Sequence, residues 1–426
     1  MKQRHRVLTL LGLLSILTFL DRLAIAVAGP AIQSDLHIQP QQWGWILSAY
    51  VLANGIFEVP SGATGDRRGQ RGEMTRIVTW WSCFNALTGW CRGFWQLCAS
   101  RFLFGLGAAG AYPNIAGVIA RWFPARERAR CQGLVWAASR LGGALAPVLI
   151  VPLVHFFGWR AAFRVLALAG FTWAAVWWLR FRNRPQDDPS VTPAELAEIG
   201  ETRAAHHETS IPWRRLFRSR ALWLIILAYG CYGCGSWFYF SWFPTWMVHT
   251  AGFSLNGVLF ASLPFLVGLA ANLVGGDLGD RLTLRWGARR ALRWIPATCL
   301  TATALLLIAM AVFHGKIAVV VLSSLGFGVM DLMLPSAWAL CLAIGGRLSG
   351  TATGMMNTAG QAGGFLCTVL FGYIVHATGS YNLPLWFIAA MVFISAVVFT
   401  RIDCTQCIDA DVCPQGRDQA RLPSRT

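Results

Sequence analysis

The sequence predicts an all-α membrane protein with twelve transmembrane helices in two pseudo-symmetric six-helix bundles. Two observations lead to this prediction. First, 55% of the 426 residues are hydrophobic and only 13% are charged, whereas a typical soluble domain carries about 25% charged residues. Second, a Gly-x-x-x-Asp-Arg pattern that follows an apolar run recurs half a chain later. Repeated halves are a common way to build large helical membrane proteins.

Twelve apolar runs approach the length of about 20 residues that a helix needs to cross a bilayer. We expect spans at 7–28, 43–64, 75–95, 97–120, 132–156, 161–179, 222–248, 255–276, 292–313, 317–344, 350–376 and 383–398. Residues 1–180 and 221–400 then form the two bundles, and residues 181–220 form a cytoplasmic linker between them. The polar tail, residues 401–426, is expected to be disordered. We expect no cleavable signal, because the first run is long enough to span and lacks a small-residue cleavage site.

The formal net charge of +17 would suit a protein that binds nucleic acid, but the placement of the charge argues against that function. Lys and Arg gather in the loops on one side of the predicted membrane, and the loops on the other side hold few of them. An excess of basic residues marks cytoplasmic loops. We therefore expect a multi-pass protein in the lipid bilayer, with both termini in the cytoplasm.

The repeated pattern reads Gly62-Ala-Thr-Gly-Asp66-Arg67 in the first half and Gly276-Asp277-Leu-Gly279-Asp280-Arg281 in the second. We expect each copy to form an Arg-rich loop between two helices, where glycine permits close helix approach. The Asp-Arg pairs would hold helix ends together and release them when the halves rock. An ordinary charged turn is the alternative, and the duplication disfavours it. The predicted conformational latch comprises Gly62, Asp66, Arg67, Arg71, Asp280 and Arg281.

Charged residues also lie inside predicted spans, where a charge costs about 2.5–3.5 kcal/mol on insertion scales and is normally kept for function. Asp21 and Arg22 are adjacent in the first span, Arg101 begins the fourth, and Arg140 lies within the fifth. Asp21 and Arg22 either neutralise each other or have separate partners. The second interpretation is favoured, because adjacent residues on a helix point about 100° apart. Three arginines in one half predict a positive cavity, and arginine suits carboxylates, so the favoured substrate class is an organic anion.

Few acidic residues balance these arginines. Asp21 is a candidate proton carrier, and Glu58 is interpreted as a structural partner of the first motif. Asp331, near the middle of the tenth span, fits a structural role or one of three functional roles: proton carrier, acceptor for a substrate hydroxyl, or gate partner for an arginine of the first half. A carboxylate removed from water binds a proton more readily. Proton coupling, if present, is therefore expected at Asp21 or Asp331.

Together these motifs resemble the anion:cation symporter branch of the major facilitator superfamily, whose members carry sugar acids and other organic anions. The resemblance covers nearly the whole chain and rests on residues 20–22, 62–71, 101–113, 121–128, 241–245 and 350–364. It implies that Arg22 binds the substrate carboxylate, that Asp21 takes part in proton coupling, and that Asn357 and Gln361 bind sugar hydroxyls. It also implies a bacterial inner membrane. Members commonly carry glutamate where this chain has Ala108, which cannot titrate, so uniport or exchange is an alternative to symport.

Tyr50 and Trp242 complete the set of residues that we expect to bind the substrate. Two rival functions are less favoured. An exporter of lipophilic or cationic drugs would need acidic residues in its cavity, and this chain offers mostly arginine. An enzyme or membrane sensor would need a nucleophile–base pair, a metal site or a soluble domain. We therefore predict a transporter, not an enzyme, that works as a monomer without a metal or other cofactor.

Overall fold

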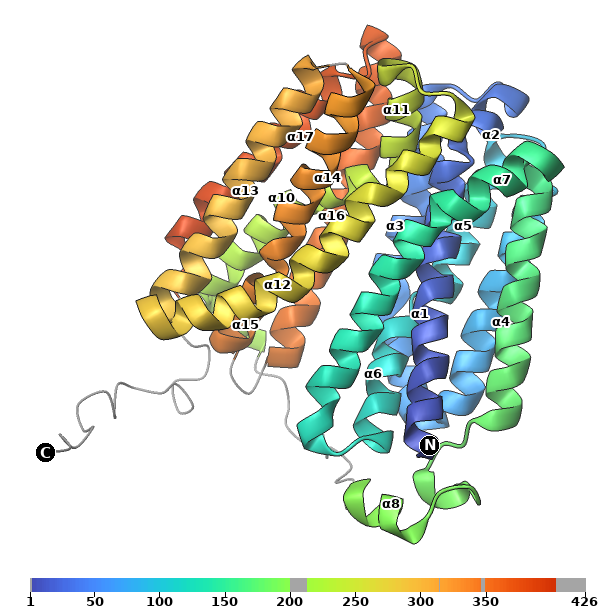
Figure 1. Ribbon diagram of the computed structural model, residues 1–426, viewed down its shortest axis with the longest axis vertical. Helices are drawn as coiled ribbons and strands as arrows, with labels where there is room; N and C mark the ends of the chain where they lie inside the picture. The colour runs from blue at the N-terminus through green and yellow to red at the C-terminus, as the bar shows by residue number, and fades with distance from the viewer. Residues whose placement is uncertain (1, 200–212, 314, 346–348, 404–426) are drawn as a thin grey trace, which may run out of the picture.

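The computed structural model describes residues 2–199, 213–313, 315–345 and 349–403, and within these ranges all regular elements are helices. Figure 1 shows long helices running roughly side by side along the long axis. The first half comprises α1 (Gln3–Val27), α2 (Gly29–Leu36), α3 (Pro40–Arg68), α4 (Gln70–Thr88), α5 (Phe94–Ala108), α6 (Ala111–Trp122) and α7 (Ala125–Arg180).

The second half lies beside the first (Figure 1). The connection contains η1 (Pro185–Asp187), α8 (Pro193–Ile199) and α9 (Trp213–Arg218). The second half then comprises α10 (Arg220–Ser241), α11 (Phe243–Ala251), η2 (Leu255–Ser262), α12 (Leu263–Trp286), α13 (Ala288–Val312), α14 (Lys316–Leu332), α15 (Leu334–Gly345), α16 (Ser349–Thr378) and α17 (Leu383–Arg401). The all-helical membrane fold predicted from composition is thus present.

Within the described chain, nine segments are long and apolar enough to cross a membrane. These nine include α7 once and leave out α3 and α4. The expected number of twelve is reached only when α3 and α4 are added and the two arms of α7 are counted as two spans. Helices α3 and α4 are not among these segments, since polar residues such as Asn54 and Glu58 in α3, and Glu73 and Arg76 in α4, lower their hydropathy. The count of twelve therefore stays a prediction, and so do the exact boundaries of the two bundles.

The long helix α7 turns back on itself at Gly158, where φ is 78° and ψ is 158°. Only glycine adopts such a backbone conformation at little cost. One arm begins near Glu127, which pairs with Arg4 of α1, and the other ends near Trp178, whose carbonyl binds Arg71 of α4. The expected spans at 132–156 and 161–179 therefore correspond to the two arms of α7, and the chain turns between them at Gly158.

The two motif copies are not loops, as the sequence analysis expected, but the last turns of helices α3 and α12. Each helix ends at a single glycine of nearly the same backbone geometry: φ 88° and ψ 145° at Gly69, φ 81° and ψ 149° at Gly287. The reason is that extending a helix that has already formed adds one backbone hydrogen bond per residue, so the helix continues through the motif. The matching turns support the internal repeat.

Glycines bring α10 and α16 together. A Cβ added to Gly363 would overlap the carbonyl oxygen of Gly230, and one added to Gly233 would overlap that of Gly360. In a bilayer, close backbone packing through small residues replaces the hydrophobic effect as a source of helix association. These two helices therefore form a tightly packed pair within the second half.

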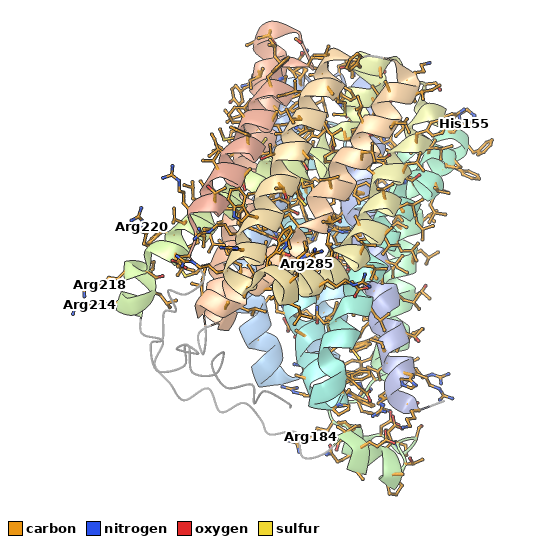
Figure 2. All side chains as sticks on the ribbon, turned by 60° about the vertical axis from the view of Figure 1, so that its left-hand side comes forward. His155, Arg184, Arg214, Arg218, Arg220 and Arg285 are labelled. Atoms are coloured by element: carbon orange, nitrogen blue, oxygen red, sulfur yellow. The ribbon has the colours of Figure 1, made fainter. Side chains whose placement is uncertain are left out.

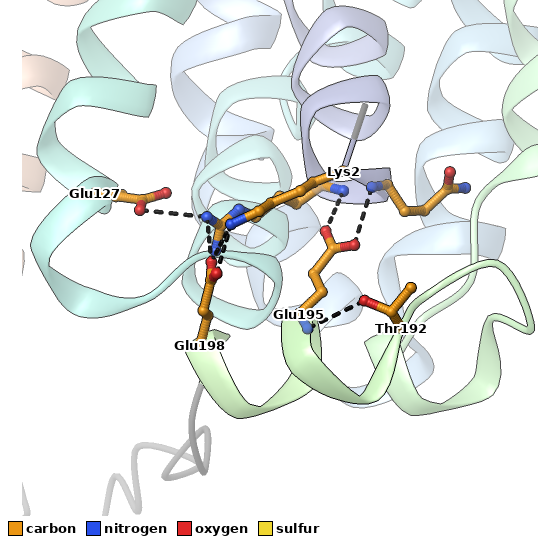
Figure 3. Close-up of polar contacts among 7 residues, drawn as sticks. Lys2, Glu127, Thr192, Glu195 and Glu198 are labelled. Carbon is orange, nitrogen blue, oxygen red and sulfur yellow. Dashed lines mark hydrogen bonds and ion pairs between the residues drawn. The ribbon is translucent and has the colours of Figure 1, made fainter.

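The connecting helix α8 is fastened to the first half (Figure 3). The Glu195 carboxylate accepts hydrogen bonds from the backbone N–H groups of Gln3 at 3.1 Å and Arg4 at 2.9 Å. These donors have no partner within the first turn of α1. The Arg4 guanidinium pairs with Glu198 at 2.8 Å and with Glu127 at 3.5 Å. The cluster thus joins α1, α7 and α8.

Candidate substrate site

A small cavity lies between the two halves, enclosed by α1, α3, α5 and α10. Its volume is about 10 Å³, which is about the minimum that holds one water molecule. The charged and polar groups of its lining come mainly from the first half, and aromatic rings of the second half close it. Its lining includes Arg22, Tyr50, Arg101, Phe104, Trp237, Phe240 and Ser241.

Arg22 is held in this cavity by one hydrogen bond and by aromatic rings. Its Nε donates to the Tyr50 hydroxyl at 2.8 Å. Its guanidinium carbon lies 4.8 Å from the centre of the Phe19 ring and 5.8 Å from that of Trp237. Among the residues that the structure describes, Arg22 forms no ion pair, and its two terminal nitrogens donate no hydrogen bond. A guanidinium in this arrangement is suited to receive a carboxylate through two parallel hydrogen bonds.

Arg101 is buried beside the same cavity, but it is already engaged within the first half. Its Nη2 contacts the Thr88 hydroxyl and donates to the Asn85 side-chain oxygen at 3.3 Å. The Asn85 amide in turn donates to the Asp21 carboxylate at 2.9 Å. Asn85 therefore bridges the two buried charges, and neutralisation of Arg22 by the adjacent Asp21 is not what the structure shows.

Arg140 does not line the cavity, because it pairs with Asp331 across the interface between the halves. Its Nε lies 2.7 Å from one carboxylate oxygen, and its Nη2 donates to the other at 3.0 Å. Both side chains are buried. Asp331 is thus paired with an arginine of the first half, and its role as a gate or proton carrier stays a prediction.

A row of polar side chains follows the contact between α3 and α16. The Gln361 amide donates to Asn54 at 3.4 Å, and the Asn357 amide lies 3.3 Å from both carboxylate oxygens of Glu58. Asn357 and Gln361 thus face α3 of the first half. Glu58, which the sequence analysis assigned to the motif loop, instead contacts the second half.

Trp242 lies away from the cavity, although it was expected to bind substrate. Its indole N–H donates to the Thr368 carbonyl at 3.0 Å, and its ring stacks on Phe371 with centroids 4.5 Å apart. Trp237, five residues earlier on α10, lines the cavity in its place. Helical spacing alone does not tell which of these two rings faces inward, because both lie in an apolar run.

The described contacts between the halves run from the end opposite the N-terminus to the middle of the bundle. They include Gln33 with Thr245 at 3.5 Å and Trp45 with Tyr373 at 3.3 Å. The cavity is therefore closed toward the end opposite the N-terminus.

The family model of the Major Facilitator Superfamily matches residues 11–368, which is most of the chain. The chain belongs to the Major Facilitator Superfamily. It is therefore a transporter and not an enzyme, and the fold predicted from the repeated motif is confirmed.

Three named transporters are similar in sequence to this chain over most of its length, and they support the same assignment. The probable sulfoacetate transporter SauU of Cupriavidus necator is 32% identical over 99% of both chains. The probable galactarate/D-glucarate transporter GudP of Bacillus subtilis is 29% identical over 91% of this chain and 89% of that one. The hexuronate transporter of Bacillus subtilis is 26% identical over 89% and 90%.

A solved structure shares the fold of this superfamily member. It is that of a bacterial homologue of the human lysosomal transporter Spinster, in an inward-facing, unoccupied conformation. The two chains superpose with a TM-score of 0.78 over 94% of this chain and 97% of that one. They are 18% identical, so the likeness concerns the fold alone.

Within this superfamily fold, the predicted latch is described only in part. Arg71 donates from Nε and Nη2 to the Trp178 carbonyl, at 2.9 and 2.7 Å, and its backbone N–H binds Asn183. Arg71 therefore joins α4 to the end of α7 within the first half. Arg281 is exposed at the end of α12. The structure describes only the helical backbone at the other latch residues. The side chains of Asp66, Arg67 and Asp280, and the surroundings of Gly62, lie outside the described part of the chain.

Proposed function

We propose that this transporter carries a small organic anion by alternating access, with the substrate's acidic group bound at Arg22. One observation supports the proposal above the others. Arg22 lines the cavity between the halves, and within the described chain it forms no ion pair. Arg101 is connected to the Asp21 carboxylate through Asn85, and Arg140 pairs directly with Asp331. An anion that enters the cavity would complete the charge balance at Arg22.

The names of the relatives support the same substrate class. Sulfoacetate, galactarate, glucarate and hexuronates are all small organic acids. The described residues that line the cavity include two arginines and no acidic residue, which argues against an exporter of cations. Asn357 and Gln361, which we expect to bind hydroxyl groups, lie at the α3–α16 contact. Gln361 is connected to the cavity through Asn54, which donates to Tyr50 of the cavity lining.

Proton coupling is part of this proposal, with Asp21 and Asp331 as the carriers inferred from the sequence. Asp21 is buried and accepts a hydrogen bond from Asn85, and Asp331 is paired with Arg140. An asparagine at position 21 would keep the contact to Asn85 and remove the titratable group. The expected result for Asp21→Asn is retained binding with loss of uptake driven by a pH gradient.

We further propose that both termini face the cytoplasm of a bacterial inner membrane, and that a single chain is the working unit. Arg184 lies at the lower end of the view, with Arg214 and Arg218 also in its lower half, whereas His155 lies near the top (Figure 2). Basic residues favour the cytoplasmic side. The cavity is built within one chain. The two bundles, residues 1–180 and 221–400, would rock about this cavity, with the motif residues Asp66, Arg67, Asp280 and Arg281 as latch.

The test is a thermal-shift screen of the purified protein with sulfoacetate, galactarate, glucuronate, a neutral sugar and a lipophilic cation. A ligand present at about 100 times its Kd stabilises the folded protein by about 2.7 kcal/mol. We expect an anion to shift the wild type and not Arg22→Ala. Arg164→Ala is the matched control, because Arg164 is exposed on α7. A shift by the lipophilic cation alone, equal in wild type and Arg22→Ala, would contradict the proposal.

A further inference from the structure

We propose that Glu58 takes up a proton from the solvent when an anion binds at Arg22, and so couples proton movement to anion transport. The inference rests on the proposed function, since it concerns the same cavity. It assigns a role to a carboxylate that neither the motif nor the relatives' names single out. Glu58 lies on the polar row that starts at Arg22, it has no cationic partner among the described residues, and the charge at Arg22 changes when an anion binds.

Glu58 lies at the end of a polar row that begins in the cavity. Tyr50, Asn54 and Glu58 follow one another at intervals of four residues on α3, so they share one face of the helix. Tyr50 accepts a hydrogen bond from Arg22 at 2.8 Å and one from Asn54 at 3.5 Å. The next polar side chain along this face is Glu58, which is half-buried. The row thus leads from Arg22 toward the end of α3 that lies nearer the N-terminus.

The partner of Glu58 is a neutral side chain of the other half. The Asn357 amide of α16 lies 3.3 Å from each carboxylate oxygen. The contact joins the two halves, and among the described residues it is the one nearest the N-terminal end of the α3–α16 seam. Any motion that separates α3 from α16 must break it. Glu58 is then left to water, where a proton is exchanged readily.

No cation neutralises Glu58 within the described chain. Asp331 is paired with Arg140, and Asp21 is hydrogen-bonded to Asn85 inside the first half. A carboxylate that is fixed by an arginine binds a proton poorly. Asp331, one of the two carriers inferred from the sequence, is therefore less suited to this role. Glu58 takes its place as the interface carboxylate that can gain a proton without leaving a buried arginine unpaired.

Arg22 of α1 is the cation at the other end of the polar row that contains Glu58, to which it is joined through Tyr50 and Asn54. The helix α16 contributes only the neutral Asn357 and Gln361 at this place. The charged groups and the tyrosine on the other helices that pack against α3 have partners other than Glu58. On α4, Glu73 pairs with Arg76 and accepts from Ser61, and Arg71 binds the Trp178 carbonyl. Arg101 of α5 binds Asn85, and on α6 Tyr112 contacts Ser139 and Arg121 contacts Gln70.

The coupling follows from this shared arginine. While Arg22 is free, its positive charge favours the ionised form of Glu58. A bound anion cancels that charge and adds a negative one, so Glu58 gains a proton from a hydronium ion of the solvent, and an O–H bond forms on its carboxyl group. When the anion leaves on the other side, the O–H bond breaks and the proton returns to water there. By linkage, protonation of Glu58 strengthens anion binding by the same factor.

The first experiment measures sulfoacetate affinity of the full chain as a function of pH. We expect the wild-type affinity to rise as the pH falls, by up to about tenfold per pH unit when one proton is taken up. Glu58→Gln is expected to bind sulfoacetate with an affinity that no longer depends on pH. In proteoliposomes it should exchange sulfoacetate across the membrane but lose accumulation driven by a pH gradient. Asp35→Asn is the control and should bind and accumulate sulfoacetate as the wild type does, because Asp35 is an exposed carboxylate that pairs with Arg160 and takes no part in the α3–α16 contacts described.

A second measurement uses the wild type alone, so that a folding defect in the variant does not decide the matter. Addition of sulfoacetate to the protein in weak buffer should remove about one proton per bound anion from solution, as in the scheme above. Anion binding without proton uptake, or pH-gradient-driven accumulation by Glu58→Gln equal to wild type, would overturn the inference and leave the proposed function standing. If none of the anions binds, the proposed function fails instead.

Discussion

The guanidinium of Arg140 and the carboxylate of Asp331 form a two-point ion pair that joins α7 of the first half to α14 of the second, with distances of 2.7 and 3.0 Å. Both groups are buried, and Phe240 and Phe327 lie within 6 Å of the guanidinium, at 5.9 and 5.7 Å. The pair crosses the interface at which the halves would move. It is therefore a candidate for one of the contacts that distinguish one state of the cycle from another.

Removal of one partner of this ion pair is expected to destabilise the protein more than removal of both. Asp331→Ala or Arg140→Ala leaves an uncompensated buried charge, which costs about 3–5 kcal/mol. The double variant, Arg140→Ala with Asp331→Ala, should be more stable than the sum of the two single effects predicts. Thermal unfolding of the four proteins in one detergent gives the coupling energy. Additive losses would show that the two groups do not depend on each other.

Substitution at the tight contact between α10 and α16 is expected to be position-specific. Gly363→Ala places a methyl group against the carbonyl of Gly230, so the helices must separate. Overpacking of this kind costs about 1–3 kcal/mol. Gly354→Ala lies on the same helix with open space around it and serves as the control, with little change or a small gain in melting temperature. Equal effects of the two changes would count against close packing at Gly363.

The contact between Glu195 and the start of α1 predicts a local effect. Glu195→Ala removes the acceptor of the Gln3 and Arg4 backbone N–H groups. Loss of such a cap costs about 0.5–2 kcal/mol. Faster hydrogen exchange should appear in the first turn of α1 and not in α17, which is the internal control. Glu195→Gln keeps an acceptor oxygen and should show a smaller change.

The pair of Asp35 and Arg160, at the end opposite the N-terminus, predicts a weak dependence of stability on pH. The Arg160 guanidinium, at 2.6 Å, lowers the pKa of the Asp35 carboxyl, with a further contribution from the Trp159 indole. A lowered folded-state pKa stabilises the protein above the unfolded pKa, and that stability is lost as the pH falls through the folded pKa. Asp35→Asn should therefore reduce stability at neutral pH, by at most about 1 kcal/mol for so exposed a pair. The difference from wild type should shrink in acid, and a constant difference would contradict the assignment.

The parts of the fold that depend on composition and on repetition could be predicted from the sequence. The apolar runs predicted membrane helices, and the repeated motif predicted two related halves. The motif itself was assigned to a loop, yet α3 continues as a helix to Arg68 and turns only at Gly69. Glycine and charged residues suggest a turn when they are considered locally, but a helix that has already formed gains one backbone hydrogen bond for each residue it adds.

The candidate site could be predicted in part. Arg22, Tyr50 and Arg101 do meet at the cavity, and their role in substrate binding stays a prediction. The partners of Arg140 and Glu58 lie about 190 and 300 residues away along the chain. Such pairings depend on how the two halves pack against each other, and the spacing of residues within one segment does not predict that packing. The interval of four residues from Tyr50 through Asn54 to Glu58 was the signal in the sequence that could have revealed the polar row.

The fastening of α8 to the first half has a mechanical consequence. The described contacts of Glu195 and Glu198 go to residues that precede the second half, so α8 moves with the first half as one rigid piece. Motion of the second half against the first would therefore leave these contacts of α8 intact. The contacts that such a motion breaks are those between the halves, such as Glu58 with Asn357.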